Sequence, residues 1–190
     1  MAKDQHLNWH KITEQVTFIA KFVALAKAKG WRVVVSGGYG LDFALGRITR
    51  NHGDIDLIIY GHAARPIAKN VLARLVDTLL PGSSLVLKQE DYYLNAKLKS
   101  PGFGGDLYYV QTQNDPFLDI CTVVKRTGEV IVNSLSQFPL PKTGKIEEVE
   151  VEVQDQKAHL DDIIRKGGMK EAKYTEDIEN IKKLLNQQSI

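Results

Sequence analysis

The most informative stretch of this sequence runs Arg50-Asn51-His52-Gly53-Asp54-Ile55-Asp56-Leu57-Ile58-Ile59. Its apolar residues predict a buried β-strand that begins near Asp54. Because successive side chains of a strand alternate between its two faces, Asp54 and Asp56 would project from the same face, one pleat apart. Two carboxylates so close repel each other and are costly to desolvate, and a shared cation removes both penalties. Mg²⁺ prefers oxygen ligands of this kind, so we expect a metal site at the start of this strand.

A glycine-rich segment precedes that strand and reads Ser36-Gly37-Gly38-Tyr39-Gly40-Leu41-Asp42. It follows a short strand predicted at 31–35 and leads into a short helix predicted at 39–45. Gly37 and Gly38 would let the backbone approach a phosphate, while the helix offers free N–H groups and its positive dipole end. The Ser36 hydroxyl could reach a phosphate or cap the helix. A glycine pair by itself favours a plain tight turn, but next to a metal site it indicates phosphoryl or nucleotidyl transfer.

Length and composition favour an ordinary globular domain. The 190 residues fit one domain, with or without a small appendage. The formal net charge of +2, with scattered Lys and Arg, does not favour a nucleic-acid binder. No apolar run approaches the ~20 residues of a membrane span, and we expect neither export nor membrane insertion. The single cysteine, Cys121, cannot form an internal disulfide, so a cytoplasmic location is expected.

Hydrophobic periodicity along the chain predicts an α+β fold. We expect one catalytic domain over residues 1–153 and a short helical segment over 154–190 that packs on it. The prolines and glycine of 139–144 predict a bend. Further helices are expected at about 9–29, 65–80, 155–166 and 175–186, and further strands at about 54–60, 84–88, 92–98, 107–111, 118–124, 129–133 and 147–153.

The order of these motifs resembles that of the small antibiotic nucleotidyltransferases, which are the aminoglycoside 2''-nucleotidyltransferases and lincosamide nucleotidyltransferases of the polymerase-β-like superfamily. The glycine pair, an Arg-x-His and an Asp-x-Asp follow one another within residues 37–56. Strong similarity covers roughly residues 33–60. The segments 91–94, 117–120 and 173–178 follow the family more weakly. The resemblance implies a polymerase-β-like core, with a mixed sheet flanked by helices and a short C-terminal helical segment.

The resemblance also implies roles for single residues. Two Mg²⁺ ions would be bound by Asp54 and Asp56, and Arg50 and His52 would help hold the nucleotide together with Ser36, Gly37 and Gly38. An arginine fork matches phosphate geometry, and a nearby anion favours a protonated histidine. Solvated loop residues are the alternative. Arg47 could instead pair with Asp42, which we expect to tie the short helix to the loop.

Asp119 is a third acidic residue, flanked by Leu118 and Ile120. A carboxylate in a buried strand is costly unless a cation or a hydrogen-bond donor accompanies it. The resemblance implies that Asp119 is catalytic and deprotonates the acceptor hydroxyl, or that it shares a metal ion. A structural, hydrogen-bonded aspartate is the alternative.

The acceptor site is expected at Glu90, Asp91, Tyr92 and Tyr93. Carboxylates beside aromatic rings suit a polycationic, sugar-like molecule through charge pairing and ring stacking. The segment Lys99–Pro116 looks like an insertion relative to the family. Within it, Asp106, Tyr108 and Tyr109 are weaker candidates for the same site.

The sequence therefore predicts a metal-dependent enzyme that moves a nucleoside monophosphate, first of all AMP from ATP, onto a hydroxyl of a small molecule. An antibiotic is the favoured acceptor, an aminoglycoside ahead of a lincosamide, which would give antibiotic resistance. A monomer or homodimer without nucleic-acid partners is expected. One alternative is a nucleotidyltransferase of a toxin system that modifies a protein or tRNA. Another is a non-catalytic nucleotide-binding module on the same fold.

Overall fold

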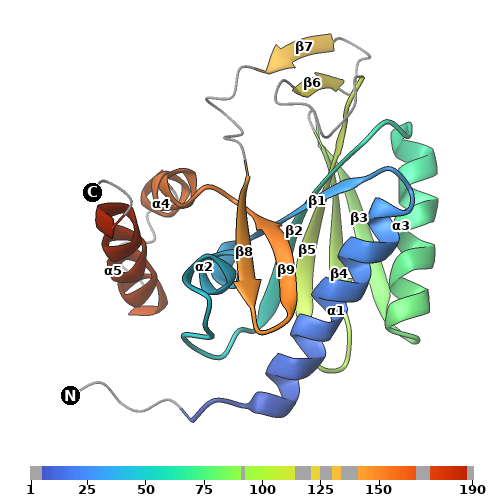
Figure 1. Cartoon of the computed structure of the whole chain (residues 1–190). Coiled ribbons are helices and arrows are strands. Elements are labelled where there is room, and N and C mark those ends of the chain that lie inside the picture. Colours follow the sequence, from blue (N-terminus) through green and yellow to red (C-terminus); the bar gives the residue numbers. More distant parts are fainter. Residues whose placement is uncertain are drawn as a thin grey trace.

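The computed structural model describes residues 6–90, 93–113, 121–124, 130–133, 141–165 and 172–187. Its elements confirm the predicted α+β class (Figure 1). The helices are α1 (Trp9–Lys27), α2 (Gly37–Leu45), α3 (Arg65–Leu79), α4 (Gln156–Arg165) and α5 (Ala172–Gln187). The strands are β1 (Arg32–Ser36), β2 (Asp54–Gly61), β3 (Ser84–Gln89), β4 (Leu94–Lys99), β5 (Gly104–Gln111), β6 (Cys121–Val124), β7 (Val130–Asn133), β8 (Lys142–Ile146) and β9 (Val149–Val153).

A mixed seven-stranded sheet forms the centre of the molecule, in the order β3-β4-β5-β2-β1-β9-β8, and β6 and β7 pair antiparallel in a separate two-stranded sheet. The central strand β2 pairs antiparallel with β1 and parallel with β5. In this register Asp56 lies opposite Ser36 on one side and opposite Asp106 on the other. Directly opposed residues of neighbouring strands project from the same face of a sheet. The register therefore brings Ser36, Asp56 and Asp106 into one row.

Strand β2 has one fully buried face. Ile55, Leu57 and Ile59 have no solvent exposure and join the main core with side chains of α1 and α3. Asp54 and Asp56 alternate with these residues and are exposed and half-buried. The prediction that both carboxylates share the face away from the core is confirmed. We call the face that carries Asp54, Asp56 and Asp106 the carboxylate face.

Strand β5 confirms the strand expected at 107–111 and begins three residues earlier, at Gly104. Residues 104–111 lie between β4 and β2 in the sheet, so interpreting Lys99–Pro116 as an insertion was wrong for this part. Gly105 is required by packing, since a Cβ there would overlap the backbone carbonyl of Ile55 on β2.

Strand β8 includes residues 142–144 of the expected bend, while residues 139 and 140 lie outside the described part of the chain. It pairs antiparallel with β9 across the whole of 142–146. A Cβ on Gly144 would lie 2.7 Å from the backbone carbon of Phe43 in α2. Gly144 therefore allows α2 to approach the sheet closely, which is a different use of glycine from a turn.

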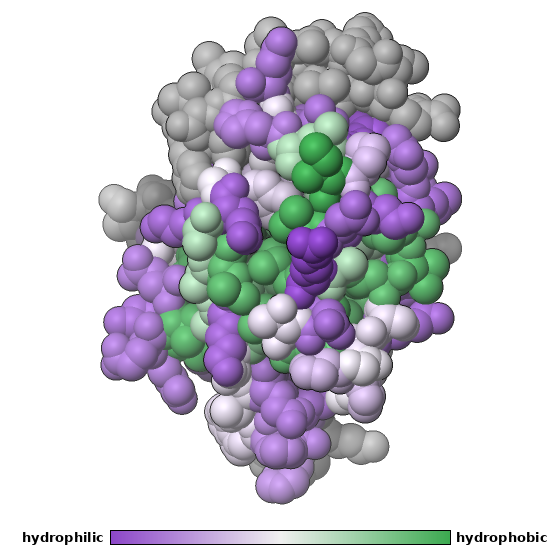
Figure 2. Space-filling model, turned by 90° about the vertical axis from the view of Figure 1, so that its right-hand side faces the viewer, coloured by the Kyte–Doolittle hydropathy of each residue, from purple (hydrophilic) through white to green (hydrophobic). Residues whose placement is uncertain are grey.

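The C-terminal helices lie beside α2 (Figure 1). Leu41 of α2, Ile163 of α4 and Ile181 of α5 form a small buried cluster. On the opposite side of the molecule, α3 and the edge strand β3 expose Ile67 and Val86, and Figure 2 shows apolar surface gathered in the middle of this side. None of the described helices combines the length and apolarity needed to cross a membrane.

Candidate active site

The site is assembled where β1 turns into α2. Gly37 is the first residue of α2 and has a φ of 63°, a conformation that favours glycine. A Cβ on Gly37 would overlap Oδ2 of Asp56. The carboxylate of Asp56 therefore lies directly against the backbone at the positive end of α2, where a helix favours negative charge.

Gly38 contacts the loop that leads into β2. A Cβ on Gly38 would overlap the imidazole of His52 and would lie 2.9 Å from Nη2 of Arg50. The structure therefore brings together the three motifs of the resemblance, which are the glycine pair, the Arg-x-His and the Asp-x-Asp. Gly37 lies against the Asp-x-Asp motif, and Gly38 lies against the Arg-x-His motif.

His52 belongs to a buried polar network beneath this turn. Its Nε2 lies 2.7 Å from Oδ2 of Asp42, and its ring packs at a tilt of 45° against Tyr39, with 4.4 Å between the ring centroids. Asp42 has no solvent exposure and also accepts hydrogen bonds from the backbone N–H and hydroxyl of Thr49, at 3.2 and 2.6 Å. The prediction that Asp42 ties α2 to the following loop is confirmed.

The network continues into α1. The Tyr39 hydroxyl donates to Oε1 of Gln15 at 2.8 Å, and the fully buried Gln15 amide donates to the His52 carbonyl at 3.4 Å. Burial raises the pKa of the Tyr39 hydroxyl, and the charge of Asp42 raises it further against a smaller lowering by Arg50. Tyr39 thus stays a neutral hydrogen-bond donor. Gln15 connects α1 to both Tyr39 and His52.

Arg50 is held by the C-terminal helix α5. Its Nε and Nη2 donate to Oδ1 and Oδ2 of Asp177 at 3.2 and 2.9 Å. Burial lowers the pKa of the guanidinium, but hydrogen bonding and charge attraction by Asp177, helped by Asp42 and Asp54, raise it overall. The attraction by Asp54 indicates that Arg50 lies within electrostatic reach of the carboxylate face.

Ser36 occupies the N-cap position of α2, but its hydroxyl does not cap the helix. It donates instead to the backbone carbonyl of Asp56 at 3.3 Å. Arg47 is exposed, and it contacts Asp42 only through a backbone hydrogen bond of 3.1 Å. The alternative of a side-chain pair between Arg47 and Asp42 is therefore not what the structure has.

Asp106 is a further carboxylate of this site. The sequence makes it a weaker acceptor-site candidate within Lys99–Pro116, and the structure places it opposite Asp56 on the adjacent strand. Asp119 lies outside the described residues, and its role stays a prediction. The strand expected at 107–111 starts directly after Asp106, and the extension of β5 back to Gly104 brings Asp106 into the sheet.

The carboxylate face has the donor chemistry of a magnesium site. Carboxylate oxygens are the ligands a hard divalent cation takes, and Asp54 and Asp106 form no ion pair within the described ranges. In the same ranges no group of three or more Asp, Glu, His or Cys side chains is placed to hold a metal ion by itself. Mg²⁺ usually combines one or two protein carboxylates with substrate phosphates and water, and the residues present fit that mode.

The predicted acceptor residues are only partly brought together. Glu90 and Tyr93 close the β3–β4 turn through a 2.9 Å backbone hydrogen bond. The Glu90 carboxylate is paired with Lys88 at 2.6 Å, and its carbonyl accepts from Arg65 at 2.8 Å. Asp91 and Tyr92 lie outside the described residues.

Tyr93 lies close to the carboxylate face. Its ring packs edge-on against Tyr108 at 5.5 Å, and Tyr108 follows Asp106 by two residues on the same face of β5. Tyr109 points the other way, has no solvent exposure and donates its hydroxyl to Ala63 at 2.7 Å. The candidacy of Tyr109 for the acceptor site was wrong, because the pleat turns it into the core.

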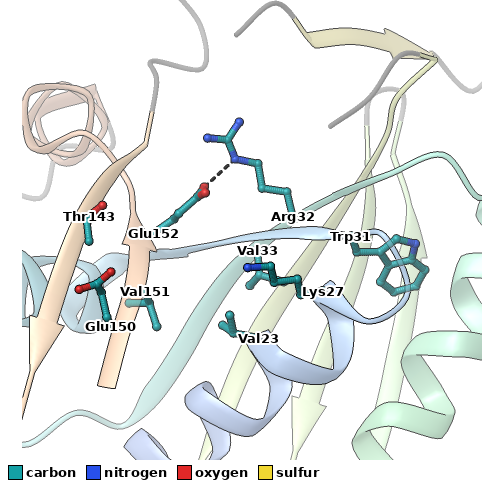
Figure 3. Close-up of a pocket in the computed structure, with 9 residues that line it drawn as sticks. All are labelled: Val23, Lys27, Trp31, Arg32, Val33, Thr143, Glu150, Val151 and Glu152. Atoms are coloured by element: carbon teal, nitrogen blue, oxygen red, sulfur yellow. Dashed lines mark hydrogen bonds and ion pairs between the residues drawn. The ribbon is translucent and has the colours of Figure 1, made fainter. Parts of the chain in front are cut away.

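A separate cavity of about 260 Å³ lies between α1, β1 and the β8–β9 hairpin (Figure 3). It exists because β1 and β9 pair only at Val34 and Val35, so that the strands diverge toward Arg32. Arg32 bonds Glu152 across the opening at 2.6 Å. None of the candidate site residues lines this cavity.

Comparison with known proteins agrees with this arrangement. Residues 18–79 match the family model described as aminoglycoside-2''-adenylyltransferase. Two curated 2''-aminoglycoside nucleotidyltransferases, from Escherichia coli and Klebsiella pneumoniae, are each 45% identical over 86 residues. These matches cover 45% of this chain and 44% of each relative, so the chain aligns with less than half the length of the curated relatives.

Solved structures extend the likeness to the whole fold. ANT(2'')-Ia in complex with adenylyl-2''-tobramycin matches with a TM-score of 0.64 and 21% identity, over 92% of this chain and 91% of that one. The lincomycin-bound lincosamide adenylyltransferase LnuA matches with a TM-score of 0.59 and 18% identity, over 88% and 96% of the two chains. The expected resemblance is therefore confirmed: the chain has the polymerase-β-like fold of the antibiotic nucleotidyltransferases, and through residues 18–79 it matches the aminoglycoside-2''-adenylyltransferase family.

Proposed function

We propose that this protein is a metal-dependent nucleotidyltransferase that transfers a nucleoside monophosphate, with ATP as the first candidate donor, onto a hydroxyl of a small molecule. One observation carries the proposal. The two glycines at the start of α2 lie against the Asp-x-Asp and Arg-x-His motifs, so that neither accepts a Cβ. Backbone N–H groups, carboxylates and a cationic fork thus converge at a helix N-terminus, as triphosphate binding requires.

Asp54 and Asp56 would hold the magnesium ions. Bound Mg²⁺ would stabilise the charge on the attacking and departing oxygens of an in-line displacement. The turn at Gly37 and Gly38 would bind the triphosphate through its backbone. Arg50 would bind the triphosphate beside that turn through its guanidinium, and the buried His52 would keep the turn in place.

In the reaction, the acceptor hydroxyl oxygen forms a bond to the α-phosphorus, and the bond from that phosphorus to the β-phosphate oxygen breaks. Pyrophosphate leaves, and the hydroxyl proton passes to a carboxylate. We assign this general-base role to Asp106, because it lies in register with Asp56 and forms no ion pair in the described part of the chain. Asp119 is the alternative base, and the two can be separated by mutation.

The acceptor would bind over the part of the carboxylate face next to Asp106. The Tyr93–Tyr108 pair offers ring faces for a sugar-like molecule. Two observations favour a less cationic acceptor than an aminoglycoside. Glu90 is already neutralised by Lys88, and the exposed Lys97 lies opposite Asp106 on β4. A lincosamide-like antibiotic therefore becomes at least as good a candidate as an aminoglycoside.

Calorimetric titration with ATP and Mg²⁺ tests the donor half of the proposal. Binding should be detected for the unchanged protein and should weaken at least tenfold in Asp54→Asn. A screen for pyrophosphate release with aminoglycosides, lincosamides, sugars and nucleosides then tests the acceptor half. Heat that is unchanged by Asp54→Asn would contradict a metal-bridged nucleotide.

A further inference from the structure

The C-terminal helix α5 reaches the proposed nucleotide site through one buried charge. Asp177 is 2% exposed, although an unpaired carboxylate is costly to bury. Its partner Arg50 lies 127 residues earlier in the chain. The two side chains form a two-bond fork at 3.2 and 2.9 Å, which fixes the plane of the guanidinium as well as its position.

The same guanidinium nitrogen connects Asp177 to the glycine turn. Nη2 of Arg50 bonds Oδ2 of Asp177 and lies 2.9 Å from the Cβ position of Gly38. Nη1 makes only a long contact of 3.5 Å with the carbonyl of Asn51. Since a guanidinium has five N–H groups, Asp177 uses two of them and leaves others for a phosphate oxygen.

Apolar packing holds α5 in the position that this contact needs. Ile181 of α5 has no solvent exposure and lies in one cluster with Leu41 of α2. Asp177 and Ile181 are four residues apart and therefore lie on the same side of the helix. One side of α5 thus contacts both the helix that begins at the glycine pair and the arginine beside it.

We propose that Asp177 is a positioning residue of the nucleotide site, which orients the Arg50 fork against Gly38 so that its remaining N–H groups bind the triphosphate. This inference rests on the proposed nucleotidyltransferase function. The C-terminal helix then contributes to nucleotide affinity without touching the nucleotide. The contribution acts on the phosphates and leaves the nucleoside unaffected.

The test compares the affinities of adenosine, AMP, ADP and ATP with Mg²⁺ in the unchanged protein and in Asp177→Asn. We expect ATP affinity to fall about tenfold or more, and adenosine affinity to change less than twofold. Glu176→Gln and Glu179→Gln are matched controls, because these carboxylates are exposed on the same helix. Both controls should bind every nucleotide as the unchanged protein does.

Two further variants separate positioning from a merely structural role. In an Arg50→Gln background, Asp177→Asn should cause no further loss of ATP affinity. Arg50→Lys keeps the charge but loses the fork, and should lower ATP affinity even if Asp177→Asn fails to fold. Equal weakening of adenosine and ATP, additive losses in the double variant, or unchanged ATP affinity in Arg50→Lys would each overturn the inference. If the unchanged protein binds no ATP, the proposed function itself fails, and the positioning role falls with it.

Discussion

Gly38 is the residue at which the fit of the site is tightest. In Gly38→Ala the new methyl group would collide with His52 and Arg50. We expect a loss of about 1–3 kcal/mol in unfolding free energy, as for overpacking in a well-packed region, together with weaker ATP binding. Urea denaturation and ATP titration measure the two effects.

Gly53→Ala is the matched control for that experiment. A Cβ at Gly53 meets nothing within 4 Å, and its φ lies outside the left-handed region, although it precedes Asp54 directly. It should change stability by less than about 0.5 kcal/mol, as a surface substitution does. Equal effects of the two alanines would contradict the packing argument.

Several single-residue properties could be predicted from the sequence because they are local. The alternation of side chains along β2 predicts that Asp54 and Asp56 share one face. The short distance in sequence between Asp42 and the following loop predicts their contact, which the structure has at Thr49. The ion pair between Arg50 and Asp177 is not local, since it depends on how α5 docks on α2. No periodicity in the sequence carries that information.

The buried carboxylate of Asp42 connects helix α2 to the loop that follows it. Asp42 accepts three hydrogen bonds, two from Thr49 and one from His52, with no solvent exposure. Asp42→Ala leaves buried donors without partners, and we expect it to lower the unfolding free energy by about 3 kcal/mol. Asp77→Ala, at an exposed position of α3, should have little effect in the same urea titration.

Most elements were predictable, including the strand at 107–111, but residues 142–144 of the expected bend form part of strand β8. Gly105 in β5 and Gly144 in β8 both allow another backbone to come close within the core. A glycine in a strand and a glycine in a turn look alike in sequence, because the difference lies in a neighbour that is distant along the chain.

At the scale of the whole molecule, two buried tyrosines predict alkaline unfolding. Burial raises the pKa of Tyr39 and of Tyr109 above the ordinary value of 10.0, with Asp42 adding to the effect at Tyr39 and the Ala63 carbonyl and Arg65 opposing it at Tyr109. Above pH 10 the unfolded chain releases these protons while the folded chain keeps them. Stability is therefore complete below pH 10 and is lost as pH rises further.

Each tyrosine should contribute a slope of at most about 1.4 kcal/mol per pH unit in that range. In Tyr39→Phe and Tyr109→Phe the decline of unfolding free energy between pH 10 and 11.5 should be shallower than in the unchanged protein. Denaturant titrations at a series of pH values measure it. An unchanged slope in both variants would contradict the burial argument.

The proposed function depends on carboxylates of two adjacent strands that serve the same transfer step. Those of β2 would bind the metal ions, and Asp106 of β5 would accept the proton of the acceptor hydroxyl. The most direct test is the steady-state rate of pyrophosphate release with the best acceptor, for the unchanged protein, Asp106→Asn and Asp119→Asn. We predict that Asp106→Asn lowers kcat by roughly 10²–10⁴-fold, the range for a lost general base, while ATP affinity is kept and Asp119→Asn stays active. Full activity in Asp106→Asn would contradict the account.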